Sequence, residues 1–134
     1  MIALGTLVAI QAAHSVEECL EHLWEVHPLA RFVASLFSPD LATGFAIGNV
    51  LLVAFGVWCT FGPVRLGWSS AAVLAWLWVA IEAINGFSHI AWSAFVGAYR
   101  PGLLTAPFLL AGAAWLARRL QRETPPAPRR TNTP

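Results

Sequence analysis

The chain has 134 residues, of which 57% are hydrophobic and 11% are charged, and its formal net charge at pH 7 is +1. Soluble domains usually carry about a quarter charged residues, so this sequence has too little polar side chain to cover a water-facing surface. All eight basic residues are arginines, and no basic stripe precedes the C-terminal segment, so we expect no nucleic-acid partner. The composition instead predicts an integral membrane protein.

Hydropathy predicts four membrane-spanning segments, each close to the roughly 20 residues that cross a bilayer. Their expected ranges are about 3–26, 41–61, 69–96 and 102–118. Backbone groups in lipid must be hydrogen-bonded internally, and no alternation indicates a barrel, so we expect helices. The first segment lacks a preceding basic region, so we expect no signal peptide. The predicted fold is therefore all-α, an integral membrane four-helix bundle formed by residues 1–118.

The C-terminal segment 119–134 is rich in arginine and proline, a composition that builds no hydrophobic core, and we expect it to be disordered. Its positive charge favours a cytoplasmic C-terminus, and an even number of spans places the N-terminus on the same side. We expect a multi-pass protein of a plasma or inner membrane. Gly44 and Gly48 form a GxxxG pattern, a face on which helices pack closely and through which a homo-oligomer could form.

Two clusters of polar residues interrupt these apolar segments. The first span carries five such residues on one helical face, within an arc of about 100°: His14, Glu17, Glu18, Glu21 and Glu25. The third span carries three on one face: Glu82, Asn85 and His89. A charged residue at the centre of a membrane helix costs about 2.5–3.5 kcal/mol, so these groups should face the protein interior and find partners there.

If the first and third spans run in the same direction, the polar residues of the two faces lie at the same depths in the membrane. His14 then lies beside Glu82, and Glu21 lies beside His89. Glutamates and histidines that project inward from a bundle are the ligands of di-iron and di-manganese proteins. A structural zinc site would more often use cysteines and close with four ligands. We therefore expect divalent metal ions, two of them, with iron favoured and zinc or manganese as alternatives.

Each polar residue has an expected role. The metal ligands are expected to be His14, Glu17, Glu18, Glu21, Glu82 and His89. Glu17, as a general base, and Asn85, as a weak ligand or a group that positions water, are the expected catalytic residues. Five others could orient a ligand or contact a substrate: His22, Glu25, Asn49, Tyr99 and Arg100. Solvation at the helix end is the equal alternative for His22 and Glu25, Asn49 is favoured to bond across helices, and His27 is expected at the membrane surface.

The residues His14-Ser15-Val16-Glu17-Glu18 resemble the signature of the HXXEE family of small membrane proteins. The cluster in the third span is similar to that family's second polar cluster, and the segment YRPGLLTAP at 99–107 is similar to its following Tyr-x-Pro-Gly segment. The resemblance covers nearly all of the chain except the tail. It implies a membrane protein that is a metal-dependent enzyme, and it names no reaction.

We therefore expect a membrane-embedded, metal-dependent enzyme whose hydrophobic or lipid-like substrate arrives laterally. A carboxylate-rich two-metal centre favours an oxidoreductase of the di-iron type. A metal-dependent hydrolase that uses a metal-bound water is one alternative. A proton-coupled or ion transporter is another, because intramembrane carboxylates also mark ion pathways. Polar contacts that only hold helices together add about 0.6–2 kcal/mol each, and four glutamates exceed that need.

Overall fold

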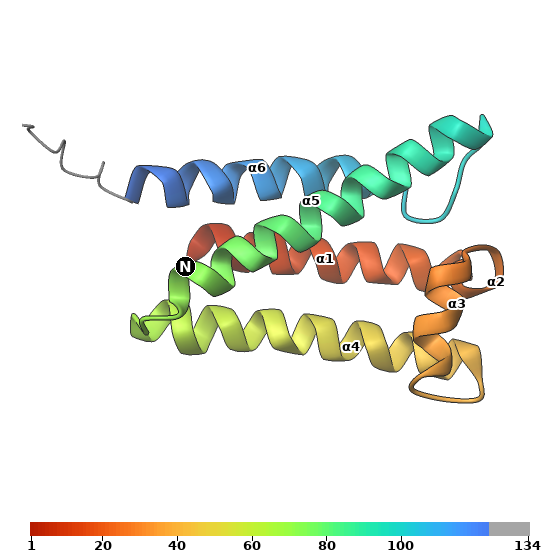
Figure 1. The fold of residues 1–134 in the computed structure, drawn as a ribbon, viewed down its shortest axis with the longest axis horizontal. Coiled ribbons are helices and arrows are strands. Elements are labelled where there is room, and N and C mark those ends of the chain that lie inside the picture. Colours follow the sequence, from red (N-terminus) through yellow and green to blue (C-terminus); the bar gives the residue numbers. More distant parts are fainter. Residues whose placement is uncertain (124–134) are drawn as a thin grey trace, which may run out of the picture.

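The computed structural model describes residues 1–123, and every regular element in that range is helical, as the all-α prediction requires. In chain order the elements are α1 (Ile2–Leu20), α2 (Leu23–Val26), α3 (Pro28–Ser35), α4 (Leu41–Cys59), the π-helix η1 (Thr60–Val64), α5 (Ala71–Val96) and α6 (Ala106–Glu123). The expected four-helix bundle is wrong in helix number, because the short helices α2 and α3 stand between two of the long ones (Figure 1). Of the segment 119–134 that we expected to be disordered, residues 119–123 form the end of α6, and residues 124–134 lie outside the described residues.

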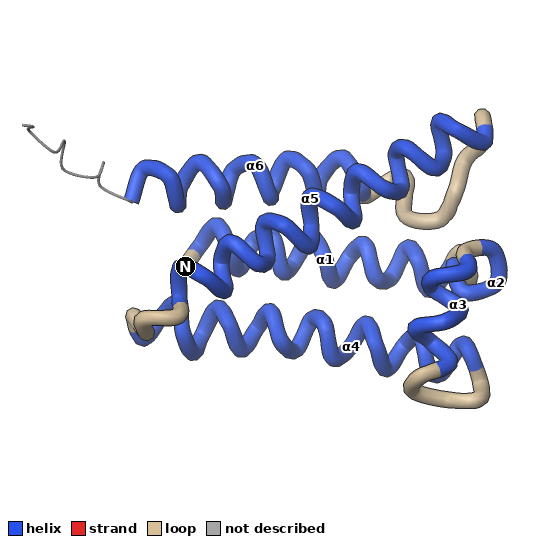
Figure 2. The backbone as a smooth tube through the Cα atoms, in the orientation of Figure 1, coloured by secondary structure: helices blue, strands red, loops and turns tan. Residues whose placement is uncertain are grey.

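The four long helices run along one axis, α1 and α5 in one direction and α4 and α6 in the other (Figures 1 and 2). Helix α1 contacts both α4 and α6, while α5 packs mainly along α6. The start of α1 and the end of α6 lie at the same end of the molecule. Helices α2 and α3 and the loop between α5 and α6 occupy the opposite end, so polar residues from several elements meet there.

Helix boundaries differ from expectation where glycine, proline or a left-handed residue intervenes. The first expected span breaks at His22, whose φ of 50° ends α1, and α3 begins at Pro28. Proline suits the first helical position but disfavours helical geometry in the residue before it, here the extended His27. Helix α6 starts later than expected, because Gly102 has a φ of 88°, and it continues to Glu123.

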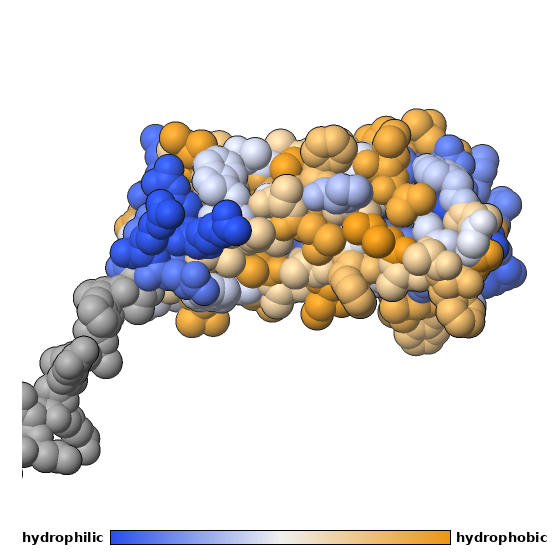
Figure 3. Space-filling view, turned by 90° about the horizontal axis from the view of Figure 1, so that it is seen from above, coloured by the Kyte–Doolittle hydropathy of each residue, from blue (hydrophilic) through white to orange (hydrophobic). Residues whose placement is uncertain are grey.

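Within residues 1–123, two helical stretches are long and apolar enough to cross a membrane: Leu41–Val64, which joins α4 to η1, and Ala71–Val96, which is α5. Only 17% and 22% of their most apolar parts are buried inside the molecule, so their side chains mostly face outward rather than into a core. We also expected α1 and α6 to span the membrane, but neither is long and apolar enough by the same criterion of length and hydropathy. On the face in Figure 3, apolar residues fill the middle and hydrophilic residues gather at both ends, as lipid around the middle would favour.

Gly44 and Gly48 allow α4 to approach α3 of the same chain. A Cβ atom at Gly44 would collide with the backbone carbonyl oxygen of Ala34. A Cβ atom at Gly48 would lie 3.3 Å from the side chain of Phe37, which can move. The close packing predicted for the GxxxG pattern therefore occurs inside the molecule, where it fixes α3 across the end of α4.

The substitution Gly44→Ala should lower the free energy of unfolding by about 1–3 kcal/mol, because the new methyl group meets backbone that cannot rotate away. Thermal unfolding in detergent, followed by circular dichroism, measures the effect. The matched control is Gly48→Ala, which should change the midpoint much less. Equal midpoints for the two variants would contradict the packing of α3 against Gly44.

Candidate metal site

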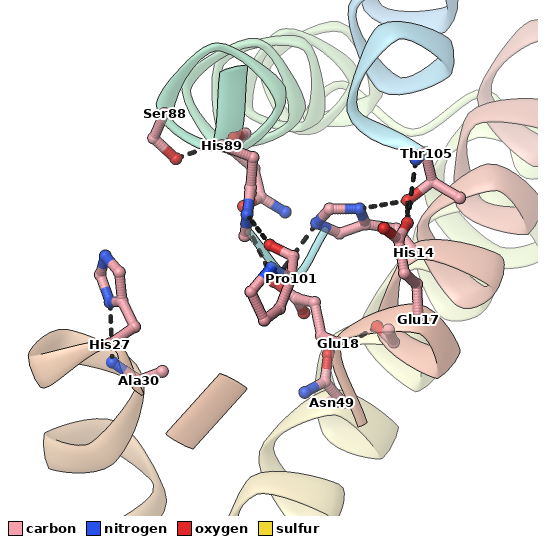
Figure 4. Close-up of polar contacts among 12 residues, drawn as sticks. His14, Glu17, Glu18, His27, Ala30, Asn49, Ser88, His89, Pro101 and Thr105 are labelled. Atoms are coloured by element: carbon pink, nitrogen blue, oxygen red, sulfur yellow. Dashed lines mark hydrogen bonds and ion pairs between the residues drawn. The ribbon is translucent and has the colours of Figure 1, made fainter. Parts of the chain in front are cut away.

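Three of the predicted ligands converge in the structure. His14 and Glu18 lie one turn apart on α1, and His89 reaches them from α5 (Figure 4). The Nε2 atoms of His14 and His89 lie 3.3 Å and 3.0 Å from Oε1 of Glu18. The exposed fractions of His14, Glu18 and His89 are 0%, 6% and 5%. Three potential metal-ligand atoms thus share one buried volume, all within 4.8 Å of one another.

Hydrogen bonds on the far side of each imidazole decide which nitrogen carries the proton. Nδ1 of His89 lies 2.6 Å from the carbonyl oxygen of Pro101, which can only accept, so Nδ1 donates. Nδ1 of His14 lies 2.6 Å from Oγ1 of Thr105. That hydroxyl donates its own hydrogen to Glu17, so it accepts from His14. In the neutral rings both Nε2 atoms therefore present lone pairs to Glu18.

This arrangement fits a cation. Two imidazole lone pairs and a carboxylate oxygen face one another, and Nε2 of His14 is buried without a hydrogen-bond partner among the described residues. One proton could satisfy only one of the two nitrogens, whereas one divalent ion satisfies both nitrogens and the carboxylate. Tetrahedral ligand atoms about 2.0–2.2 Å from zinc are about 3.3–3.6 Å apart, so the His14–Glu18 distance of 3.3 Å matches that spacing and the His89–Glu18 distance of 3.0 Å is shorter. In metal sites the ligating histidines typically donate a hydrogen bond from their other ring nitrogen, as His14 and His89 do here.

Glu17 has a different role from the one its sequence position suggested. Its carboxylate turns away from Glu18 and accepts four hydrogen bonds from the loop between α5 and α6. The donors are the Tyr99 hydroxyl at 2.7 Å, the Leu104 N–H at 2.9 Å, and the N–H and hydroxyl of Thr105 at 2.9 Å and 2.5 Å. Both oxygens are therefore occupied by the loop, and Glu17 is not among the residues that converge at Glu18. It fixes Thr105, which orients His14.

Tyr99 and Gly102 complete this loop. Partial burial, the hydrogen bond to Glu17 and the charges of Glu17 and Glu21 raise the pKa of Tyr99 to about 12, so its hydroxyl remains a donor at neutral pH. A Cβ atom at Gly102 would lie 2.5 Å from Nδ1 of His89 and 2.9 Å from Cε1 of His14. Gly102 thus packs directly against both imidazoles and leaves no space for a side chain.

Glu82 lies deeper in the protein, with no exposed surface. Neither of its carboxylate oxygens has a hydrogen-bond partner within residues 1–123. Its charge interacts with that of Glu18, so the two carboxyl groups lie in the same region of the interior. An unpaired buried carboxyl group is costly unless it is protonated or close to a cation. Glu82 is therefore available as a further ligand or as a group that accepts a proton.

The register between α1 and α5 differs from the expected one. His89 lies beside His14 and Glu18, about one turn before Glu21, so the predicted pairing of Glu21 with His89 is wrong. Glu21 itself is exposed at the end of α1. The reason is that helical periodicity defines a face but not the level at which two helices meet, and the loop after α5 sets that level here.

Other predicted site residues lie around the cluster or away from it. Glu25 and His22 are exposed, and the His22 ring contacts Trp24. Arg100 places its guanidinium 5.2 Å from the Trp92 ring centre, a cation–π contact. None of these three side chains reaches the cluster of His14, Glu18 and His89 in the described structure.

A row of hydrogen bonds joins α5, α1 and α4 beside the cluster. Asn85 donates to Gln11 at 3.4 Å, Gln11 donates to Ser15 at 3.0 Å, and Ser15 donates to Asn49 at 2.5 Å. Asn49 therefore makes the cross-helix bond favoured from the sequence. Sequence reasoning missed Gln11, which is almost fully buried, although an amide within an apolar segment is the kind of signal that could have indicated it.

A cavity of about 640 Å³ opens beside the cluster, between α3, α4 and α5. Glu18 and His89 form part of its wall, together with Gln11, Asn49 and Asn85. His27 also lines it, with its ring 4.9 Å from that of Trp92, and its side chain is half-buried at this end of the molecule. Burial and the nearby charge of His89 lower the pKa of His27, which favours the neutral ring.

The substitution Gly102→Ala should abolish metal binding, because the new methyl group occupies space that both imidazoles need. Gly97→Ala is a matched control, since Gly97 also has a positive φ, 68°, but a Cβ atom there meets nothing within 4 Å. Both variants carry similar backbone strain, and only the first disturbs the histidines. Calorimetric titration with Zn²⁺ measures the difference, and equal affinities would contradict the predicted contact.

The substitution Thr105→Val should weaken metal binding about 10- to 100-fold, the usual cost of losing a hydrogen bond behind a ligating histidine. Valine keeps the shape of threonine but cannot accept from His14. The control is Thr60→Val, which removes a buried hydroxyl that bonds the carbonyl oxygen of Gly56, away from the site. A similar loss in both variants would indicate general destabilisation rather than misorientation of His14.

The comparisons with known proteins place the chain in a family and assign no function to the site. No curated protein and no solved structure matches the chain. The family described as "Protein of unknown function with HXXEE motif" matches residues 6–116, which include every residue of the cluster and the loop that orients it. His14, Glu17 and Glu18 are the named residues of that motif, and the chain belongs to the HXXEE family.

Proposed function

We propose that this protein is a membrane-embedded, metal-dependent enzyme that acts on a hydrophobic substrate. The observation that carries the proposal is the convergence of His14, Glu18 and His89, whose hydrogen-bonded environment directs three electron-pair donors at one buried point. A structural role alone would not require two nitrogen lone pairs to face a carboxylate. The adjoining cavity supplies the space that a substrate needs.

The geometry favours one metal ion over the two expected from the sequence. Of the six predicted ligands, Glu17 is fully engaged by the loop and Glu21 is exposed. The remaining set is two histidines and Glu18, with Glu82 nearby. Two histidines and one carboxylate with open positions are typical of non-haem iron oxygenases and also of catalytic zinc sites. A bound ion would supply Lewis acidity or, as iron, access to oxygen chemistry.

Oxidation is the leading reaction class. The cavity is lined mainly by hydrocarbon side chains, including Ile81, Ile84 and Phe45, and such a wall suits a substrate that is itself largely hydrocarbon. Hydrolysis is the second candidate, and a specific observation favours it. Glu82 is a buried carboxyl group without a hydrogen-bond partner in the described chain, and it could take a proton from an attacking water.

We further propose that all four long helices cross the membrane, with the site toward the side opposite the termini. Four of the six arginines in the described residues lie at the end that holds the start of α1 and the end of α6: Arg65, Arg118, Arg119 and Arg122. The other end carries Arg31 and Arg100 together with Glu21, Glu25 and Asp40. Positive charge accumulates on the cytoplasmic side, so both termini would be cytoplasmic.

Elemental analysis of protein purified without chelator should give one equivalent of iron, zinc or manganese per chain. His14→Ala, Glu18→Ala and His89→Ala should each lose the metal, because each removes one of three ligands. The matched controls His22→Ala and Glu21→Ala should retain it, since both side chains are exposed outside the cluster.

The identity and number of the ions discriminate among the alternatives. If the bound metal is iron, oxidation is the reaction to assay next, and if it is zinc, hydrolysis is. Two equivalents would restore the two-metal prediction. A folded protein that holds no metal, and that moves protons across liposomes in a manner dependent on Glu18 and Glu82, would overturn the enzyme proposal in favour of a transporter.

A further inference from the structure

The charge of the cavity limits what it can bind. Among the described residues that line it, Glu18, His27 and His89 are ionisable, and none is an arginine. A lipid carboxylate or phosphate would therefore meet no side-chain cation and would approach Glu18 and the neighbouring Glu82. The positive charge of a bound divalent ion would be balanced by the negative charges of those two carboxylates. An uncharged polar group suits this environment better than an anionic one.

Two side chains in the wall can satisfy such a group. Nδ1 of His27 accepts from the backbone N–H of Ala30 at 3.4 Å, so in the neutral ring Nε2 carries the hydrogen and can donate. Asn85 donates to Gln11, and its side-chain oxygen accepts no hydrogen bond in the described structure. The donor of His27 matches a hydroxyl or a carbonyl oxygen, while Asn85, about two turns along α5 from the Trp92 ring that His27 contacts, offers a separate acceptor deeper in the same cavity.

The remaining wall is hydrocarbon and reaches the surface. Leu29, Val33 and Phe37 line the cavity from α3 and its C-terminal end, and all three side chains are also exposed. They lie across the cavity from the polar residues of α1 and α5. A long apolar chain could therefore extend from the polar group, between α3, α4 and α5, toward the surrounding lipid.

We propose that the cavity binds an uncharged lipid that carries a single hydroxyl or carbonyl oxygen, which accepts a hydrogen bond from Nε2 of His27, with its hydrocarbon chain along α3 and α4. This assignment deepens the proposed function by naming its substrate class. His27 acts here as a specificity-determining residue, a role that its position before Pro28 did not suggest. The proposal needs the metal site only for chemistry, not for binding.

The test uses the full chain in liposomes and a photoreactive diazirine analogue of hexadecanol, with cross-linked residues mapped by mass spectrometry. Hexadecanol and hexadecanal should halve the labelling at concentrations at least about fivefold lower than hexadecane or palmitate need. His27→Phe keeps an aromatic ring beside Trp92 and removes the donor, so competition by hexadecanol should weaken about 3- to 10-fold while that of hexadecane stays unchanged. His22→Phe, outside the cavity, is the control and should have no effect.

If His27→Phe does not fold, His27→Ser removes the same donor while its hydroxyl can cap α3. Three results would overturn the inference. Palmitate could compete better than the alcohol, hexadecane could compete as well as hexadecanol, or the labelled residues could lie outside the cavity. The measurement is made with and without chelator, which separates it from the proposed function. Selective binding of the alcohol by a chain that holds no metal would overturn only the enzyme proposal, and a metal-loaded chain that prefers palmitate would overturn only this inference.

Discussion

The attachment of Glu17 to the loop between α5 and α6 is the contact on which the rest of the site depends. Its four hydrogen bonds hold that loop against α1. The same loop supplies Thr105 to His14 and the carbonyl oxygen of Pro101 to His89. The two adjacent glutamates of the motif therefore have different roles. Glu18 faces the histidines, whereas Glu17 points about 100° away around the helix and fixes the groups that orient the histidines.

The sequence predicted the helices and the identity of the central residues for sound physical reasons. Long apolar segments require internal hydrogen bonding, so the all-α class followed from composition alone. The cost of charge in an apolar segment indicated that His14, Glu18, Glu82 and His89 need partners, and the structure buries all four. The break at His22 was harder to anticipate, because only Pro28, six residues later, marked a helix boundary within that polar segment.

The remaining features depend on backbone geometry that side-chain patterns do not encode. The partner of His89 is a main-chain carbonyl, and its position follows from the left-handed conformation of Gly102. Helix α5 also approaches α6 closely, where a Cβ atom at Gly86 would lie 2.8 Å from the carbonyl oxygen of Ala106. The contact of His27 with the cavity was not predicted, because nothing in the sequence showed that α3 folds back over α4. A cavity between helices is visible only once their packing is known.

The distance along the chain between Glu17 and its partners has a consequence for biosynthesis. Thr105 is 88 residues from Glu17, so at about 5–20 residues per second the ribosome needs roughly 4–18 seconds to make it. In the four-span arrangement, α1 meets the insertion machinery with two carboxylates and an imidazole that have no partners yet. Their desolvation cost falls only when α5 and α6 arrive. A chain that ends before Thr105 would therefore leave Glu17 without the full set of four hydrogen bonds that the loop donates to it.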